Sequence, residues 1–311
     1  MKTLKHILLT SAFIAASIAP SAMGEVKKIG LAVPNLQADY FNQIKMGVEK
    51  YAAELGIEVI TVDAKNDTAT QVSQVQDLIT QDIDAFIYVP AGAAAATVPT
   101  RLAKGAGIPV INVDRFPETE PGNTFIAGES KNSSYEVCKY IIEKAGGTGE
   151  MAIIHGQKGT TPEVDRYEGC KRAIDEYPDV KVVAQQWTEM WSPNEGFQVA
   201  QNMLQAHPNI KVIFAQADAM AMGAAKATDV AGLSEQVIIG GYDGDTSALE
   251  YLAKGEGPFI VTATQQTQAM GRLAVDSAVK AEAGEEIPEF QLTDAVITTS
   301  ENAPKFVAEH P

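Results

Sequence analysis

Residues 29–62 read IGLAVPNLQADYFNQIKMGVEKYAAELGIEVITV, and this stretch decides the fold class. Two short runs rich in Val and Ile, 29–33 and 58–62, flank a longer segment, 40–55, of helical period. That segment carries one apolar stripe, formed by Ile44, Val48, Tyr51 and Leu55. A buried strand, a helix and a second buried strand predict a βαβ unit with a parallel sheet.

The same alternation continues along the whole chain. The strand candidates are 29–33, 58–62, 85–89, 110–113, 151–155, 181–184, 212–215, 237–240 and 260–263, and 69–79 is a further helix. Four strands precede Thr124 and five follow Gly149, so the pattern predicts an α/β protein with two similar, doubly wound, parallel-sheet lobes. A TIM barrel is the competing architecture. The break at 117–122, followed by a new strand-like run at 124–127, argues against it.

Length and composition agree with two soluble lobes. The chain has 311 residues, 45% hydrophobic and 21% charged, which suits two domains with their own cores. Its formal charge of −16 repels phosphate backbones, so we expect no nucleic-acid partner.

The first 24 residues have the pattern of a secretory signal peptide. Lys2 and Lys5 precede an apolar stretch, 7–18, and small residues follow up to Gly24, after which we expect cleavage. No later run approaches 18 apolar residues, so we expect an exported protein that is not embedded in a membrane. In a cell with two membranes this predicts a periplasmic location.

Polar and aromatic residues directly after the strands are the candidates for a site, because ligands bind beyond the carboxyl ends of such strands. Tyr40 and Phe41 follow the first strand, Asp114 and Arg115 the fourth, and Asp243 lies in the segment 240–244. Each has a structural alternative: a hydrophobic staple, a surface ion pair and a turn aspartate, respectively.

Two further stretches contribute candidates. Residues 155–161 follow a strand and precede a helix with Arg166, but they lack the Walker spacing of a phosphate loop. Residues 186–191 hold two tryptophans in a polar segment. We expect Trp187 to pack and Trp191 to form a ligand wall.

The residue inventory does not favour an enzyme. His6, His155, His207 and His310 supply no metal cluster and no triad, so we expect no catalytic residue, no metal site and no cofactor. Asp114 and Asp243 could in principle cleave a glycoside, but Arg115 would hold Asp114 ionised, which suits hydrogen-bond acceptance.

Cys138 and Cys170 are the two cysteines of the chain. In an oxidising compartment they could form a disulfide, and the alternative is two buried free thiols. The sequence leaves both open.

Taken together, the sequence resembles periplasmic sugar-binding proteins of the ribose-binding type, the receptors of ABC importers. The matching stretches are 108–115 (IPVINVDR), 206–208 (AHP), 212–224 (VIFAQADAMAMGA) and 241–244 (GYDG). The resemblance implies two lobes that close over one ligand in the cleft between them. They would be joined by three crossing segments near 126–128, 262–265 and 288–292. The N-terminal lobe would comprise 25–127 and about 265–288, and the C-terminal lobe about 128–264 and 289–311.

The resemblance also implies the ligand contacts and the partners. The contacts would be Tyr40, Phe41, Asp114, Arg115, Arg166, Trp191, Asp243 and Gln265. Ala38 and Ala217 stand where ribose binders carry asparagines, so the ligand would be another small sugar, polyol or cyclitol. The partner would be an inner-membrane ABC permease, and the protein a monomer. A receptor for a sugar-like signal such as a furanosyl autoinducer fits the same residues, whereas a transcription regulator would need a DNA-binding head.

Overall fold

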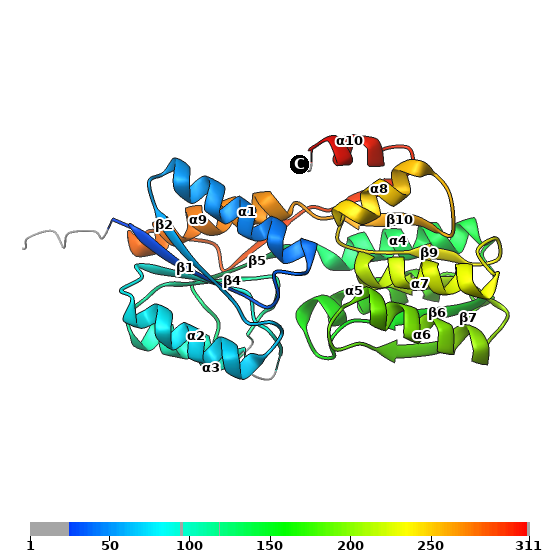
Figure 1. Ribbon diagram of the computed structural model, residues 1–311, viewed down its shortest axis with the longest axis horizontal. Coiled ribbons are helices and arrows are strands. Elements are labelled where there is room, and N and C mark those ends of the chain that lie inside the picture. Colours follow the sequence, from blue (N-terminus) through cyan, green and yellow to red (C-terminus); the bar gives the residue numbers. More distant parts are fainter. Residues whose placement is uncertain (1–24, 94–95, 118, 310–311) are drawn as a thin grey trace, which may run out of the picture.

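The computed structural model describes residues 25–93, 96–117 and 119–309. The expected signal segment, 1–24, lies outside them. Two α/β lobes lie end to end along the longest axis of the molecule (Figure 1). Each lobe is built on a six-stranded sheet, so the chain forms two sheets and no closed barrel.

The first lobe is a fully parallel sheet covered by helices on both faces. Its strand order is β11-β5-β4-β3-β1-β2. The strands are β1 (Lys28–Val33), β2 (Glu58–Asp63), β3 (Ala85–Tyr88), β4 (Val110–Val113), β5 (Thr124–Gly128) and β11 (Phe290–Thr293). The helices are α1 (Asp39–Glu54), α2 (Thr68–Thr80), α3 (Thr97–Gly105) and α9 (Thr267–Glu282). Helices α1 and α9 pack on one face and α2 and α3 on the other, which explains why the Val- and Ile-rich strands are buried on both sides.

The second lobe repeats this architecture with the order β12-β10-β9-β8-β6-β7. Its strands are β6 (Gly149–His155), β7 (Val180–Trp187), β8 (Ile210–Ala215), β9 (Ile238–Gly240), β10 (Phe259–Thr264) and the antiparallel β12 (Val296–Thr299). Its helices are α4 (Ser130–Lys144), α5 (Thr161–Asp175), α6 (Pro193–Ala206), α7 (Asp218–Ala231), α8 (Thr246–Lys254) and α10 (Ala303–Glu309). Helices α4 and α5 cover one face, and α6, α7 and α8 cover the other.

The predicted βαβ pattern is confirmed, since every strand candidate corresponds to a strand of one of the two sheets. Two edge strands differ from the prediction. Strand β12 was not predicted, because one of its four residues, Thr298, is buried and the four do not form an apolar run. Strand β11 pairs in parallel with β5 of the first sheet, whereas we assigned the chain from residue 289 onward to the C-terminal lobe. The prediction was wrong at this boundary, because β11 is partly exposed and carries no signal of the sheet it joins.

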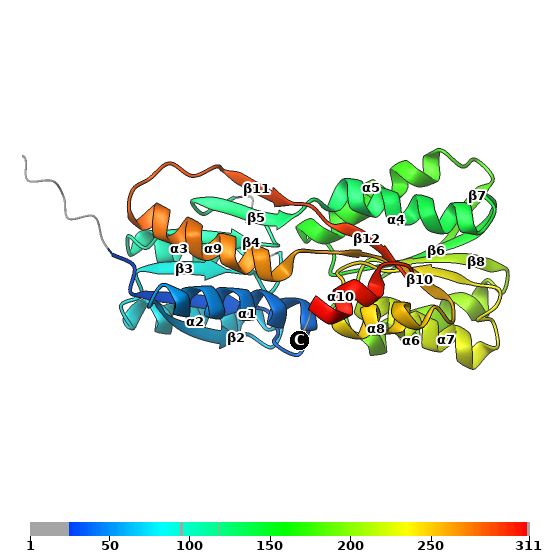
Figure 2. The same ribbon diagram turned by 90° about the horizontal axis from the view of Figure 1, so that it is seen from above.

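The chain passes between the two sheets at three points, which lie together at the middle of the molecule. They connect β5 to α4, β10 to α9, and β11 to β12, and Figure 2 shows β11 running directly into β12. The third crossing therefore lies between Thr293 and Val296, later than the predicted 288–292.

Helices α1 and α9 approach so closely that two glycines are required at their contact. A Cβ on Gly47 would overlap the backbone carbonyl oxygen of Gln268, and one on Gly271 would overlap that of Ile44. We expect Gly271→Ala to lower the free energy of unfolding by about 1–3 kcal/mol, because overpacking forces the helices apart. Urea denaturation measures this. Gly105→Ala is the matched control, since Gly105 is exposed and a Cβ there meets open space. An equal loss in both variants would contradict the explanation.

Cys138 on α4 and Cys170 on α5 form a disulfide, so the alternative of two free thiols is not what the structure shows. Both are fully buried in the core of the second lobe. No helix in the described ranges is long and apolar enough to cross a bilayer.

Candidate ligand-binding site between the lobes

A cavity of about 410 Å³ lies where the two lobes face each other. Its first-lobe wall is Asn35, Gln37, Ala38, Asp39, Tyr40, Phe41, Asp114 and Arg115. Its second-lobe wall is Pro162, Arg166, Met190, Trp191, Ser192, Pro193, Asn194, Ala217, Ala219, Met222, Asp243, Asp245 and Ser247. Seven of the eight residues predicted from the sequence therefore line one cavity. The eighth, Gln265, lies behind it.

The lobes are in direct contact around this cavity. The Thr246 backbone N–H donates to Asp39 Oδ2 at 2.8 Å, and the Phe116 N–H donates to Thr161 Oγ1 at 2.8 Å. Each of these hydrogen bonds joins one lobe to the other, so the structure represents a closed arrangement.

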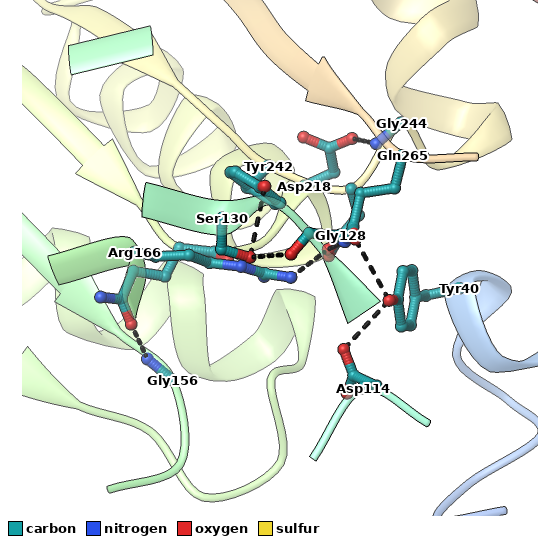
Figure 3. Close-up of polar contacts among 12 residues, drawn as sticks. Tyr40, Asp114, Gly128, Ser130, Gly156, Arg166, Asp218, Tyr242, Gly244 and Gln265 are labelled. Atoms are coloured by element: carbon teal, nitrogen blue, oxygen red, sulfur yellow. Dashed lines mark hydrogen bonds and ion pairs between the residues drawn. The ribbon is translucent and has the colours of Figure 1, made fainter. Parts of the chain in front are cut away.

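Asp114 and Arg115 follow β4 and form the polar part of the first-lobe wall. The Asp114 backbone is left-handed, with φ 65°, and the side chain is 6% exposed. Tyr40 donates to its Oδ1 at 3.0 Å (Figure 3). Arg115 Nη1 donates to the Pro90 carbonyl at 3.0 Å, and its Nε lies 3.6 Å from Asp114 Oδ2. The two charges are thus a buried pair and not the surface ion pair that was the structural alternative.

Arg166 and Asp243 form the corresponding pair in the second lobe. Arg166 Nη2 lies 2.9 Å from Asp243 Oδ1, and both side chains are at least nine-tenths buried. The guanidinium carbon stands 4.0 Å from the Tyr242 ring centroid and 5.6 Å from that of Trp191. Burial raises the pKa of Asp243 to about 7, while Arg166 opposes that rise.

One nitrogen of each arginine has no hydrogen-bond partner in the described part of the chain. These atoms, Nε of Arg115 and Nε of Arg166, are buried on side chains that line the cavity. A buried donor without an acceptor is costly, so these two atoms add to the cost of burying the arginines.

Aromatic rings provide the remaining cavity walls. Tyr40 and Phe41 project from the first turn of α1 and contact each other edge to face at 5.2 Å. Trp191 packs so closely on Gly156 that a Cβ there would overlap its ring. Trp187 instead stacks on His155 at 4.4 Å and does not line the cavity, so it packs as expected.

Gln265, on the second crossing segment, links Asp243 of the second lobe to Tyr40 of the first lobe. Its Nε2 donates to Asp243 Oδ1 at 3.1 Å, and Tyr40 donates to its Oε1 at 3.3 Å (Figure 3). In this structure it holds Asp243 and Tyr40 in place from outside the cavity.

Two glycine N–H groups of the segment 155–161 are already paired with side chains and are not free for a phosphate. Gln216 Oε1 accepts from the Gly156 N–H at 2.9 Å, and Glu163 Oε2 accepts from the Gly159 N–H at 3.0 Å. Because the Gln216 carbonyl also accepts from Arg166, this network fixes the arginine instead of binding an anion.

Three acidic residues of the site, Asp39, Asp218 and Asp245, were not predicted from the sequence. Asp218, fully buried, accepts from the N–H groups of Gly244 and Asp245 at 2.7 and 3.0 Å and so shapes the loop after β9. Burial raises its pKa to about 6. Asp39 and Asp245 line the cavity itself. The only signal for each of the three was its place at the beginning of a helix, which many structural aspartates share.

Comparison with known proteins identifies the family. The model of the periplasmic binding protein domain matches residues 29–286. The ribose import binding protein of Bacillus subtilis (strain 168) is 32% identical over 261 residues, 83% of each chain. Among solved structures, an ABC transporter solute binding protein of Actinobacillus succinogenes 130z with bound D-allose is 31% identical. It has a TM-score of 0.82 over 90% of this chain and 99% of that one. A solute binding protein of Bacillus halodurans C-125 with bound myo-inositol is 29% identical, with a TM-score of 0.84 over 92% and 99%.

These relatives are named for binding and import and not for catalysis. The two-lobed fold, the family match and the relatives confirm the resemblance predicted from the sequence. The chain therefore belongs to the periplasmic binding protein family, within the type that includes the ribose import binding proteins.

Proposed function

We propose that this protein captures one small polyhydroxylated molecule, a monosaccharide, sugar alcohol or cyclitol, between its lobes and delivers it to an ABC importer. The observation that carries the proposal is the division of the cavity wall. Asp114 and Arg115 lie in one lobe and Arg166 and Asp243 in the other, so neither lobe alone surrounds a ligand. D-allose and myo-inositol, which related proteins hold, have this chemistry.

Each side chain has a role that suits such a ligand. Carboxylates accept from hydroxyl groups, and guanidinium groups donate to ring and hydroxyl oxygens. Tyr40, Phe41 and Trp191 would cover the apolar C–H faces. Gln265 would act indirectly by holding Asp243. In this proposal residues 1–24 direct export and are removed, which places the receptor where an importer meets its substrate.

A thermal-shift screen tests the proposed ligand class. Pentoses, hexoses, polyols, inositols and deoxy sugars are compared at saturating concentration, since a ligand at 100 times its dissociation constant stabilises by about 2.7 kcal/mol. At least one of them should raise the unfolding temperature. If none does, while amino acids or peptides do, the proposed ligand class is wrong.

We expect D-ribose to bind more weakly than the best member of that panel. Ala38 and Ala217 line the cavity directly before α1 and α7, and neither has a polar side chain. A sugar hydroxyl left unpaired there costs about 1–3 kcal/mol. Calorimetric titration of ribose beside a polyol, a hexose and an inositol measures the difference. Submicromolar ribose binding that exceeds every alternative would contradict this interpretation of the alanines.

Ligand binding should also compact the protein. The ligand contacts come from both lobes, so the ligand stabilises the closed arrangement described above. Without ligand, we expect the equilibrium to shift toward open arrangements. Small-angle scattering with and without saturating ligand should show a smaller radius of gyration in the complex. Identical scattering curves would argue against closure around the three crossing segments.

A further inference from the structure

Helix α8 begins at the cavity in an unusual way, because its N-terminal carboxylate comes from the other lobe. Asp245 is the residue directly before the first turn, and its side chain makes no capping hydrogen bond to its own helix. Asp39, on α1 of the first lobe, instead accepts from the Thr246 N–H at 2.8 Å. Closure therefore brings two carboxylates together at the same helix end.

The carboxylate of Asp245 has no partner that balances its charge. In the described ranges it forms no ion pair and accepts no hydrogen bond, although it lines the cavity and is only partly exposed. The charged groups that act on it are three carboxylates, Asp243, Asp218 and Asp39, and one cation, Arg166, whose effect is the smallest. Burial and these carboxylates raise the pKa of Asp245 well above its usual value.

The cavity as a whole carries more negative than positive charge. Four carboxylates line it, Asp39, Asp114, Asp243 and Asp245, against two guanidinium groups, Arg115 and Arg166. Asp114 is paired with Arg115, and Asp243 with Arg166. The unbalanced charges are therefore those of Asp39 and Asp245, on opposite sides of the closed cleft.

The two arginines supply the charged donors of the same cavity. Arg115 and Arg166 are 4% and 3% exposed, and both line its wall. Their guanidinium groups can donate hydrogen bonds to oxygen atoms of a ligand. The acidic side of the cavity then remains available to a ligand group that donates hydrogen bonds. Metal binding is not favoured there, because no three or more acidic, His or Cys residues in the described ranges are arranged to hold an ion.

We propose that the ligand carries a protonated amine, as an amino sugar, an aminocyclitol or an amino polyol does, and that its ammonium group binds between Asp245 and Asp39. This inference rests on the proposed function and specifies its ligand class. An ammonium group donates three hydrogen bonds, and the two carboxylates have free acceptor sites for them. It would also remove the like-charge repulsion that closure creates.

Matched ligand pairs test the inference by calorimetric titration at pH 7. The pairs are D-glucose and D-glucosamine, D-galactose and D-galactosamine, D-sorbitol and 1-amino-1-deoxy-D-sorbitol, and myo-inositol and an amino-deoxy-inositol. In at least one pair the amine should bind about tenfold or more tightly than its hydroxyl partner, because a charged hydrogen bond is roughly twice as strong as a neutral one.

The variant Asp245→Asn removes the negative charge of this side chain and keeps its size. It should reduce the ratio of amine to hydroxyl affinity by about tenfold. Asp77→Asn, an exposed position on α2 far from the cleft, should leave that ratio unchanged. An unchanged ratio in Asp245→Asn, or hydroxyl partners that bind as tightly as every amine, would overturn the inference and leave the proposed function standing. If neither member of any pair binds, and the sugar screen is also negative, both proposals fail.

Discussion

Replacement of Asp243 by asparagine should weaken ligand binding by about 2 kcal/mol or more, which is about 30-fold in affinity. The variant keeps the size of the side chain and tolerates the backbone φ of 126° better than alanine would. It removes the charge that faces Arg166 at 2.9 Å, so the ligand loses a charged acceptor and the arginine loses its partner. Titration calorimetry with the tightest ligand of the screen measures the loss.

Asp77→Asn is the matched control for this variant, because Asp77 is exposed and does not line the cavity. It should bind as the wild type does. If Asp243→Asn stays within about twofold of the wild type, Asp243 does not contact the ligand, and the second-lobe half of the proposed site is wrong.

Removal of the disulfide by Cys138→Ala and Cys170→Ala together should lower the free energy of unfolding by about 3–4 kcal/mol. The bond closes a loop with a sequence separation of 32 residues, and its loss restores the freedom of that loop in the unfolded chain. Because both sulfurs are fully buried between α4 and α5, the variant also loses core contacts. Denaturant unfolding without reductant gives the difference.

Ligand affinity serves as the internal control for the disulfide variant. Neither cysteine lines the cavity, so binding well below the unfolding temperature should change little. Two free thiols in the denatured wild-type protein, counted without reductant, would contradict the disulfide itself.

The fold could be predicted largely because its strands are buried on both faces. Runs such as 29–33 and 212–215 are apolar without alternation, as a parallel sheet covered by helices on both sides requires. The two strands at the crossing, β11 and β12, have no such constraint. Their partners are chosen by tertiary contacts, here with β5 and β10, and four half-exposed residues do not encode that choice.

Site residues could be predicted where their position directly after a strand places them at the ligand-binding edge of the sheet. Asp114 directly follows β4, and Asp243 follows β9 after only two intervening residues, so both had to lie at the edge where the lobes meet. Asp245 could not be found this way. An aspartate before a helix can cap that helix or face a cavity. For Asp245 the outcome depends on Asp39, which lies 206 residues earlier in the sequence and contacts the same helix end in the fold. Gln265 was predicted as a ligand contact, but in the structure it does not line the cavity and instead donates to Asp243.

A crystal structure of the complex with the tightest ligand tests directly whether both lobes hold it. We expect one molecule in the cavity between the lobes, with oxygen atoms within hydrogen-bond distance of Asp114 and Arg115 on one side and of Arg166 and Asp243 on the other. A ligand bound to one lobe alone, or outside this cavity, would contradict this expectation.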